Sequence, residues 1–69
     1  MTDWINIEGP RLFPFGCRVD KKSGPQWTGI VVGYYSSTFT PEGLVIECTV
    51  PGAGGQVHLE TAKRMYRND

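Results

Sequence analysis

Short runs of β-branched and aromatic residues alternate with turns along this chain. From Leu44 to Val50 every second position is apolar, which is a period of two with one apolar face. This alternation predicts a strand with one face in a core. Residues 27–35 are instead almost continuously apolar and aromatic. Such a run predicts a strand that is central in a sheet or lies under a partner.

The remaining elements are predicted from the same signals, with turns where proline and glycine cluster. Further strands are expected at 17–21 and 56–59, and turns at 22–25, 40–43 and 51–55. Residues 60–66 fit either a helical turn or a last short strand, because their polar and apolar pattern is too short to decide.

The N-terminal segment has no sustained period and is interrupted by Gly9-Pro10 and Pro14. We therefore expect residues 1–15 to form a partly ordered N-terminal arm with little regular structure. Residues 16–69 would then hold four or five short strands with no helical period between them. That pattern favours an all-β fold, a small SH3-like barrel, over a sandwich or a βαβ unit.

Size sets the next constraint, because 69 residues with 39% apolar residues make one domain with a small core. Such a core contributes only about 3–5 kcal/mol and usually needs a disulfide, a metal or a partner subunit. Cys17 and Cys48 allow at most one bridge, which we do not expect in a cytoplasmic chain. His58 is the single histidine, so no zinc-binding spacing exists. Symmetric self-association remains as the stabilising device.

Charge and hydropathy exclude several classes of function. The chain has no apolar run of membrane-spanning length and no signal-peptide pattern, so we expect a cytoplasmic protein without membrane contact. A formal net charge of zero argues against a nucleic-acid partner. No nucleophile and base pair of the serine or cysteine type is recognisable, and the glycine cluster at 52–55 lacks the residues of a phosphate loop.

Two polar pairs are candidates for binding. Lys21 and Lys22 either hold a phosphate or carboxylate group or form a solvated pair before a turn. Gln56 and His58 are two residues apart in an extended segment, so both point to one face of a strand. That face either meets solvent or lines a binding site.

A resemblance bears on this choice. The block from Gly16 to Trp27, which contains Lys-Lys-Ser-Gly, and the later Thr-Pro-Glu-Gly at 40–43 resemble the type II, trimethoprim-insensitive dihydrofolate reductases carried on mobile elements. Further single positions that match are Gly29, Val32, Gly33, Tyr35, Glu47 and Gln56. The resemblance runs without a gap from about Gly16 to Ala62. It implies an SH3-like barrel, assembled as a homotetramer around one central pore.

The same resemblance implies an activity and its ligands. In that family NADPH and dihydrofolate meet in the pore, dihydrofolate is reduced to tetrahydrofolate, and the host becomes resistant to trimethoprim. Lys21 matches the lysine that engages both the ribose phosphate of the cofactor and the carboxylate tail of the substrate. Tyr35 and Thr40 match positions that lie near the cofactor and support it.

The pore motif of the family is Val-Gln-Ile-Tyr, and the matching residues here are Gly55, Gln56, Val57 and His58. The resemblance implies that Gln56 lies against the paired rings of both ligands. Val57 would bind the nicotinamide and the pterin through its backbone, and His58 would contact the cofactor. These last three residues are the expected catalytic set.

Departures from the family pattern predict differences in activity and assembly. Gly55 and His58 replace valine and tyrosine, and because a shift of 1 Å costs about a hundredfold in rate, we expect weakened activity. A histidine ordinarily titrates at about pH 6.5, so acid is expected to alter cofactor binding or assembly through His58. Cys48 and Pro51 stand where the family pairs a serine and a histidine across an interface, which leaves a dimer as an alternative.

Two other hypotheses fit the same residues. The first is a non-catalytic SH3-like module that binds a nucleic acid, a peptide or a metabolite on the same face. The second is a tetramer in which the four copies of His58 bind a metal ion, which requires symmetry to place them at ligand distance.

Overall fold

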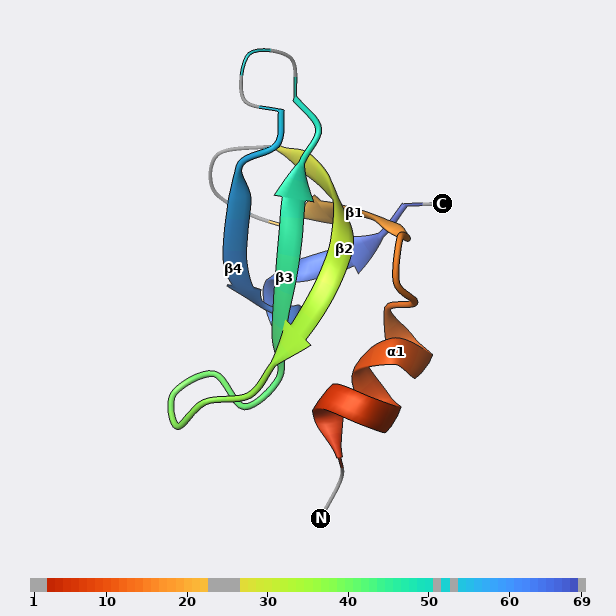
Figure 1. Cartoon of the computed structure of the whole chain (residues 1–69), viewed down its shortest axis with the longest axis vertical. Helices are drawn as coiled ribbons and strands as arrows, with labels where there is room; N and C mark the ends of the chain where they lie inside the picture. Colours follow the sequence, from red (N-terminus) through yellow and green to blue (C-terminus); the bar gives the residue numbers. More distant parts are fainter. Residues whose placement is uncertain (1–2, 23–26, 51, 53, 69) are drawn as a thin grey trace.

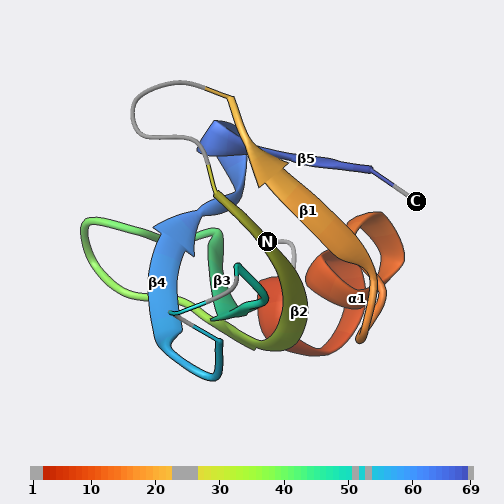
Figure 2. The same cartoon turned by 90° about the horizontal axis from the view of Figure 1, so that it is seen from above.

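The computed structural model describes residues 3–22, 27–50, 52 and 54–68, and it confirms the expected all-β class. The antiparallel strands are β1 (Arg18–Lys21), β2 (Thr28–Tyr35), β3 (Gly43–Cys48), β4 (Val57–Thr61) and β5 (Met65–Arg67). They form one sheet in the order β4-β3-β2-β1-β5. The sheet curls on itself, as Figures 1 and 2 show from two directions, so the strands surround a common interior in a small barrel-like fold.

The strand predictions are confirmed within a few residues at their ends. β2 lies in the middle of the sheet between β1 and β3, as its continuous apolar run predicted. In β3 the side chains of Leu44, Ile46 and Cys48 are buried, so the predicted alternation is real. The undecided stretch 60–66 contains parts of both alternatives, because the 3-10 helix η2 (Ala62–Arg64) leads directly into β5. Most of the expected turn at 22–25 lies outside the described residues.

The core is built from apolar residues of four strands and one residue of the N-terminal segment. Val19, Val31, Leu44 and Ile46 are fully buried, and Met65 and Trp4 join them. Burial of each such side chain contributes about 1.5–3 kcal/mol, which makes this cluster the main source of stability. Cys17 and Cys48 are buried and are not joined by a disulfide.

The expectation of little regular structure before Gly16 is wrong. Trp4–Glu8 form a π-helical turn (η1) and Gly9–Leu12 a short α-helix (α1), which packs against the side of the barrel in Figure 1. The Asp3 carboxylate begins η1 by accepting a hydrogen bond of 3.1 Å from the Asn6 N–H. These helices are too short to show a helical period, and so the sequence pattern did not reveal them. Whether residues 1–15 form a separate arm remains a prediction.

Two long-range hydrogen bonds fix this segment on the barrel. The Trp4 side chain is only 6% exposed, and its Nε1–H donates to the Gly43 carbonyl oxygen at 2.8 Å. The Tyr34 hydroxyl donates to the Phe13 carbonyl oxygen at 2.6 Å, and burial raises the pKa of Tyr34, with a smaller effect from Cys17. A buried indole needs a partner for its N–H, so the pairing with Gly43 explains why Trp4 is buried at this place. Within the described residues, no helix has the length and apolar character to cross a membrane.

Candidate functional site

In β3 the apolar side chains face the core, whereas in the edge strand β4 the most exposed side chains are apolar and polar side chains face inward. In the antiparallel register Ile46 faces His58 and Val45 faces Leu59. Directly opposed residues share a face of a sheet, so His58 lies on the face that is the core in β3, and Leu59 lies outside. Val57 and Leu59 are 56% and 64% exposed. The strand thus turns polar groups inward and apolar groups outward.

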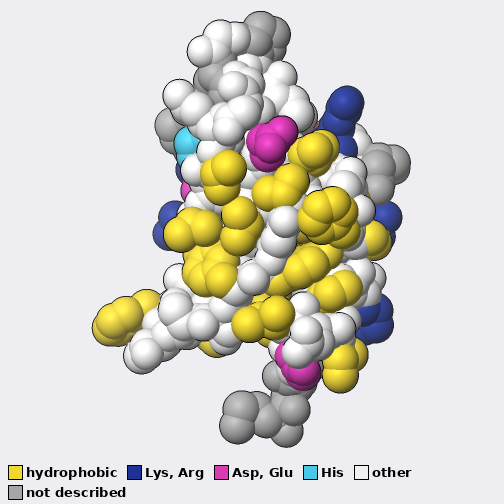
Figure 3. All heavy atoms as spheres, in the orientation of Figure 1, with side chains coloured by type: hydrophobic (Ala, Val, Ile, Leu, Met, Phe, Trp, Pro, Cys, Tyr) yellow, Lys and Arg dark blue, Asp and Glu magenta, His cyan; other side chains and the backbone are white. Residues whose placement is uncertain are grey.

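The outer face of the sheet is correspondingly apolar. Figure 3 shows hydrophobic side chains gathered over the strands at the front of the molecule, in the same orientation as Figure 1. A contiguous exposed apolar surface on a small protein indicates an interaction site. We refer below to the exposed residues Val57 and Leu59 of β4 as the outer β4 surface.

The inward-facing histidine is held by an aromatic ring. The ring centroids of Trp27 and His58 are 4.8 Å apart with an interplanar angle of 28°, which is a stacked arrangement. Trp27 immediately precedes β2 and also packs against the buried core. The indole therefore restricts how the imidazole of His58 can turn.

Lys21, the predicted anion-binding residue, makes an ion pair that the sequence did not predict. Its Nζ lies 3.7 Å from Oε2 of Glu60, and the two side chains are only 16% and 18% exposed. Glu60 follows His58 by two residues in β4 and shares its inward face. β1 and β4 are not neighbours in the sheet order, so the pair spans the interior side of the curled sheet.

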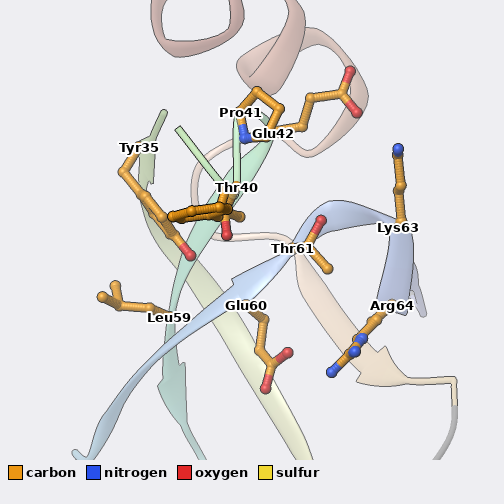
Figure 4. Close-up of a pocket in the computed structure, with 10 residues that line it drawn as sticks. Tyr35, Thr40, Pro41, Glu42, Leu59, Glu60, Thr61, Lys63 and Arg64 are labelled. Atoms are coloured by element: carbon orange, nitrogen blue, oxygen red, sulfur yellow. The ribbon is translucent and has the colours of Figure 1, made fainter. Parts of the chain in front are cut away.

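Tyr35 and Thr40 line a pocket of about 410 Å³ that also includes Glu60. Figure 4 shows these side chains with Leu59 and Arg64, which come from β4 and η2. The ring of Tyr35 lies over Gly43, where an added Cβ would come within 2.4 Å of it. The glycine of the Thr-Pro-Glu-Gly block is thus required for the position of Tyr35.

Gly55, where the family motif has valine, adopts a left-handed backbone conformation with φ of 88°. Its N–H donates to the Cys48 carbonyl oxygen at 3.0 Å, and the Cys48 N–H donates to the Gln56 carbonyl oxygen at 2.7 Å. These bonds close the connection between β3 and β4. A β-branched side chain is strained at positive φ, so this connection suits glycine and not valine.

The structure therefore groups some of the predicted site residues and separates others. Lys21, Tyr35 and Thr40 are all near Glu60. Lys21 forms the ion pair with it, and Tyr35 and Thr40 line the same pocket. His58 lies one step along the same face of β4. Gln56 and Val57 are exposed and do not line this pocket.

Sequence reasoning missed two residues of this region. The expected strand ended at residue 59, so Glu60 was not assigned to a face. Because β4 continues to Thr61, the period-two rule would have placed Glu60 on the face of His58. No comparable signal linked Trp27 to His58, because strands far apart in the chain bring them together.

The five strands curl into a small β-barrel, and the candidate site lies at the edge strand β4, near the largely buried Lys21. The chain belongs to the R67 dihydrofolate reductase family, whose family model matches residues 7–65. It is 41% identical over 46 residues to a dihydrofolate reductase type 2 of Escherichia coli, an alignment that covers 67% of this chain and 59% of that relative. A second Escherichia coli protein of that description is 54% identical over 35 residues, with 51% and 45% covered. The chain thus spans less than two thirds of the length of these curated relatives.

Proposed function

We propose that this chain is a subunit of an NADPH-dependent dihydrofolate reductase, in which four copies enclose one pore and together confer resistance to trimethoprim. Family membership over residues 7–65 supports the reaction class. We place the enzyme in the cytoplasm, and two buried cysteines that form no disulfide are compatible with a reducing compartment.

The observation that carries the proposal is the edge strand β4, which directs polar side chains inward and leaves apolar side chains exposed. Gln56, Val57 and His58 lie at or in this strand, and its outward residues Val57 and Leu59 are exposed in the single chain. Covering the outer β4 surface with further copies buries this apolar area and brings several copies of the motif together. A dinucleotide and a pterin together need a larger cleft than a chain of 69 residues readily encloses, and this supports a site shared among subunits.

The residues present fit a dinucleotide. An edge strand leaves every second backbone N–H and C=O without a strand partner on its outer side, and these groups suit the carboxamide of nicotinamide or the amide edge of a pterin. Lys21 holds a compact positive charge in a half-buried setting, which suits a ribose phosphate or a carboxylate. When bound, NADPH supplies the hydride.

The side chains of the site contribute position and not acid catalysis. Gln56 lies against the rings, Val57 binds through its backbone, and His58 contacts the cofactor from the orientation that Trp27 imposes. Tyr35 and Thr40 support the cofactor from the neighbouring pocket. The matched motif positions hold no carboxylic acid, so we propose that water delivers the proton to N5 of dihydrofolate. The rate then depends on holding the reacting carbons in a near-attack arrangement.

The proposal is tested with the purified chain, NADPH and dihydrofolate, with trimethoprim present. We expect oxidation of NADPH that trimethoprim does not inhibit, and a tetrameric mass by native mass spectrometry. The Lys21→Gln variant should have raised KM values for both ligands and the same tetrameric mass. Lys22→Gln is the matched control, because Lys22 is the adjacent, exposed lysine.

Other outcomes would contradict parts of this proposal. No turnover together with no binding of either ligand would favour the non-catalytic binding module. A monomeric mass would exclude the shared pore, and a dimeric mass would replace the tetramer. Full activity in Lys21→Gln would show that a different residue holds the anionic groups.

A further inference from the structure

The Lys21–Glu60 pair is much more enclosed than the ion pair between Arg11 and Glu8. Arg11–Glu8 lies on the surface of the N-terminal helices, where the Arg11 side chain is 62% exposed. Lys21 and Glu60 are both more than four-fifths shielded from solvent. Charges withdrawn from water interact more strongly than surface charges, so this contact matters for whatever binds Lys21.

The geometry of the pair leaves the lysine available. At 3.7 Å the Nζ and Oε2 atoms are in electrostatic contact but beyond hydrogen-bonding distance. An ammonium group has three donors, and a ligand oxygen can still approach it closely. Glu60 thus compensates the charge of Lys21 without using its hydrogen bonds.

A bound anion changes this balance. A phosphate or carboxylate that reaches Lys21 also comes close to the Glu60 carboxylate, and like charges in a poorly solvated place repel each other. Figure 4 shows the side chains of Glu60 and Arg64 pointing into the same part of the pocket that both line. Lys63 and Arg64 are therefore further cations in the pocket that Glu60 lines.

We propose that Glu60 is a built-in competitor for the anionic group that Lys21 binds, and that it determines how tightly the site holds that group. This inference rests on the proposed function and adds a residue outside the motif that the resemblance supplied. The shared ligand chemistry is an anionic oxygen group, and it comes either from the ribose phosphate of NADPH or from the carboxylate tail of dihydrofolate.

Equilibrium binding separates these sources without depending on turnover. We expect Glu60→Gln to tighten NADPH binding about fivefold, which is the effect of removing one partly buried charge contact. NADH, which lacks the ribose phosphate, should gain less. A similar gain for dihydrofolate would assign its carboxylate tail to Lys21 as well. High salt should reduce each gain, because screening weakens the repulsion.

Two controls distinguish competition from a structural role. Glu8→Gln removes the same charge from the Arg11 pair on the N-terminal helices and should leave NADPH affinity unchanged. In a Lys21→Gln background, Glu60→Gln should no longer tighten binding, because Glu60 acts through Lys21. Glu60→Met provides a second neutral variant in case Glu60→Gln unfolds, and it should tighten binding in the same direction.

Unchanged or weaker NADPH binding in both folded Glu60 variants would overturn the inference while the proposed function stands. Equal gains for NADPH and NADH, with none for dihydrofolate, would also overturn it. If the unaltered protein binds neither NADPH nor dihydrofolate, the proposed function fails first, and the inference fails with it.

Discussion

The N-terminal helices and the strand β4 treat their apolar residues in opposite ways, at two sides of one small barrel. In the N-terminal segment Trp4 is buried and donates a hydrogen bond to the Gly43 carbonyl of the barrel. In return, the Tyr34 hydroxyl of the barrel donates to the Phe13 carbonyl, just after the helices. β4 directs His58 and Glu60 inward and leaves Val57 and Leu59 exposed. One region completes the core of a single chain, and the other exposes apolar surface that a partner can cover.

The contrast shows how a short chain divides its residues between folding and assembly. Stability of the single chain depends on the N-terminal segment, because Trp4 is part of the central core cluster. In the proposed oligomer, assembly depends on β4, because Val57 and Leu59 are largely exposed in the single chain. Substitutions in the two regions should therefore affect different measurements.

The largest effect is expected from Trp4→Ala, which removes a buried ring and a hydrogen bond to Gly43. Such truncations cost about 3–5 kcal/mol in the free energy of unfolding, which can exceed the stability of a domain this small. Urea unfolding followed by circular dichroism measures the loss. Trp4→Phe, which keeps most of the ring, should cost less. A loss of under about 1 kcal/mol in Trp4→Ala would mean that the segment adds little to the core.

The second effect concerns assembly. Leu59→Glu places a charge on the outer β4 surface and should weaken self-association by about 2 kcal/mol per interface, with little change in the secondary structure of the chain. Light scattering across a dilution series measures the change in mass. Ile7→Glu is the matched control, since Ile7 is similarly exposed on the N-terminal helices. If Ile7→Glu dissociates the protein equally, the contrast between the regions is wrong.

A smaller effect is expected at the connection that leads into β4. Gly55→Val restores the residue of the family motif, but at φ of 88° the β-branched side chain should cost about 1–3 kcal/mol. Thermal unfolding measures the loss. Gly55→Asn should cost less, because asparagine tolerates the left-handed region. Equal stability of Gly55→Val and the unaltered protein would show that the connection can change its conformation.

The smallest effect is an acid dependence of the N-terminal helices. Hydrogen bonds from Asn6 lower the pKa of Asp3 from its usual value of 3.8, and the Arg11 side chain lowers that of Glu8 from 4.5. A lowered pKa stabilises the fold above the usual value, and this contribution is lost as the pH falls through the folded-state pKa. The protection of the Asn6 amide against hydrogen exchange, relative to the intrinsic rate at each pH, should fall below about pH 4. Asp3→Asn should remove this pH dependence, and unaltered protection of Asn6 in acid would contradict the proposed cap.

Much of the barrel was predictable because strands leave a local signal. The alternation from Leu44 to Val50 and the continuous apolar run of β2 depend only on neighbouring residues, and both were confirmed. The N-terminal helices left no such signal, because they are shorter than the window in which a helical period is visible. Their stability comes from Trp4 and from its contact with Gly43, which is 39 residues away in the chain.

The candidate site divides in the same way. The sequence alone determined that Gln56 and His58 share one face of an extended segment, because side chains of a strand alternate with a period of two. Only the tertiary structure decided that β4 extends to include Glu60, that His58 turns inward while Gln56 stays exposed, that Trp27 stacks on His58, and that Glu60 meets Lys21. Alternation is a property of the backbone of one strand. The direction of a face and the partner of a charge depend on how distant strands curl around a shared core.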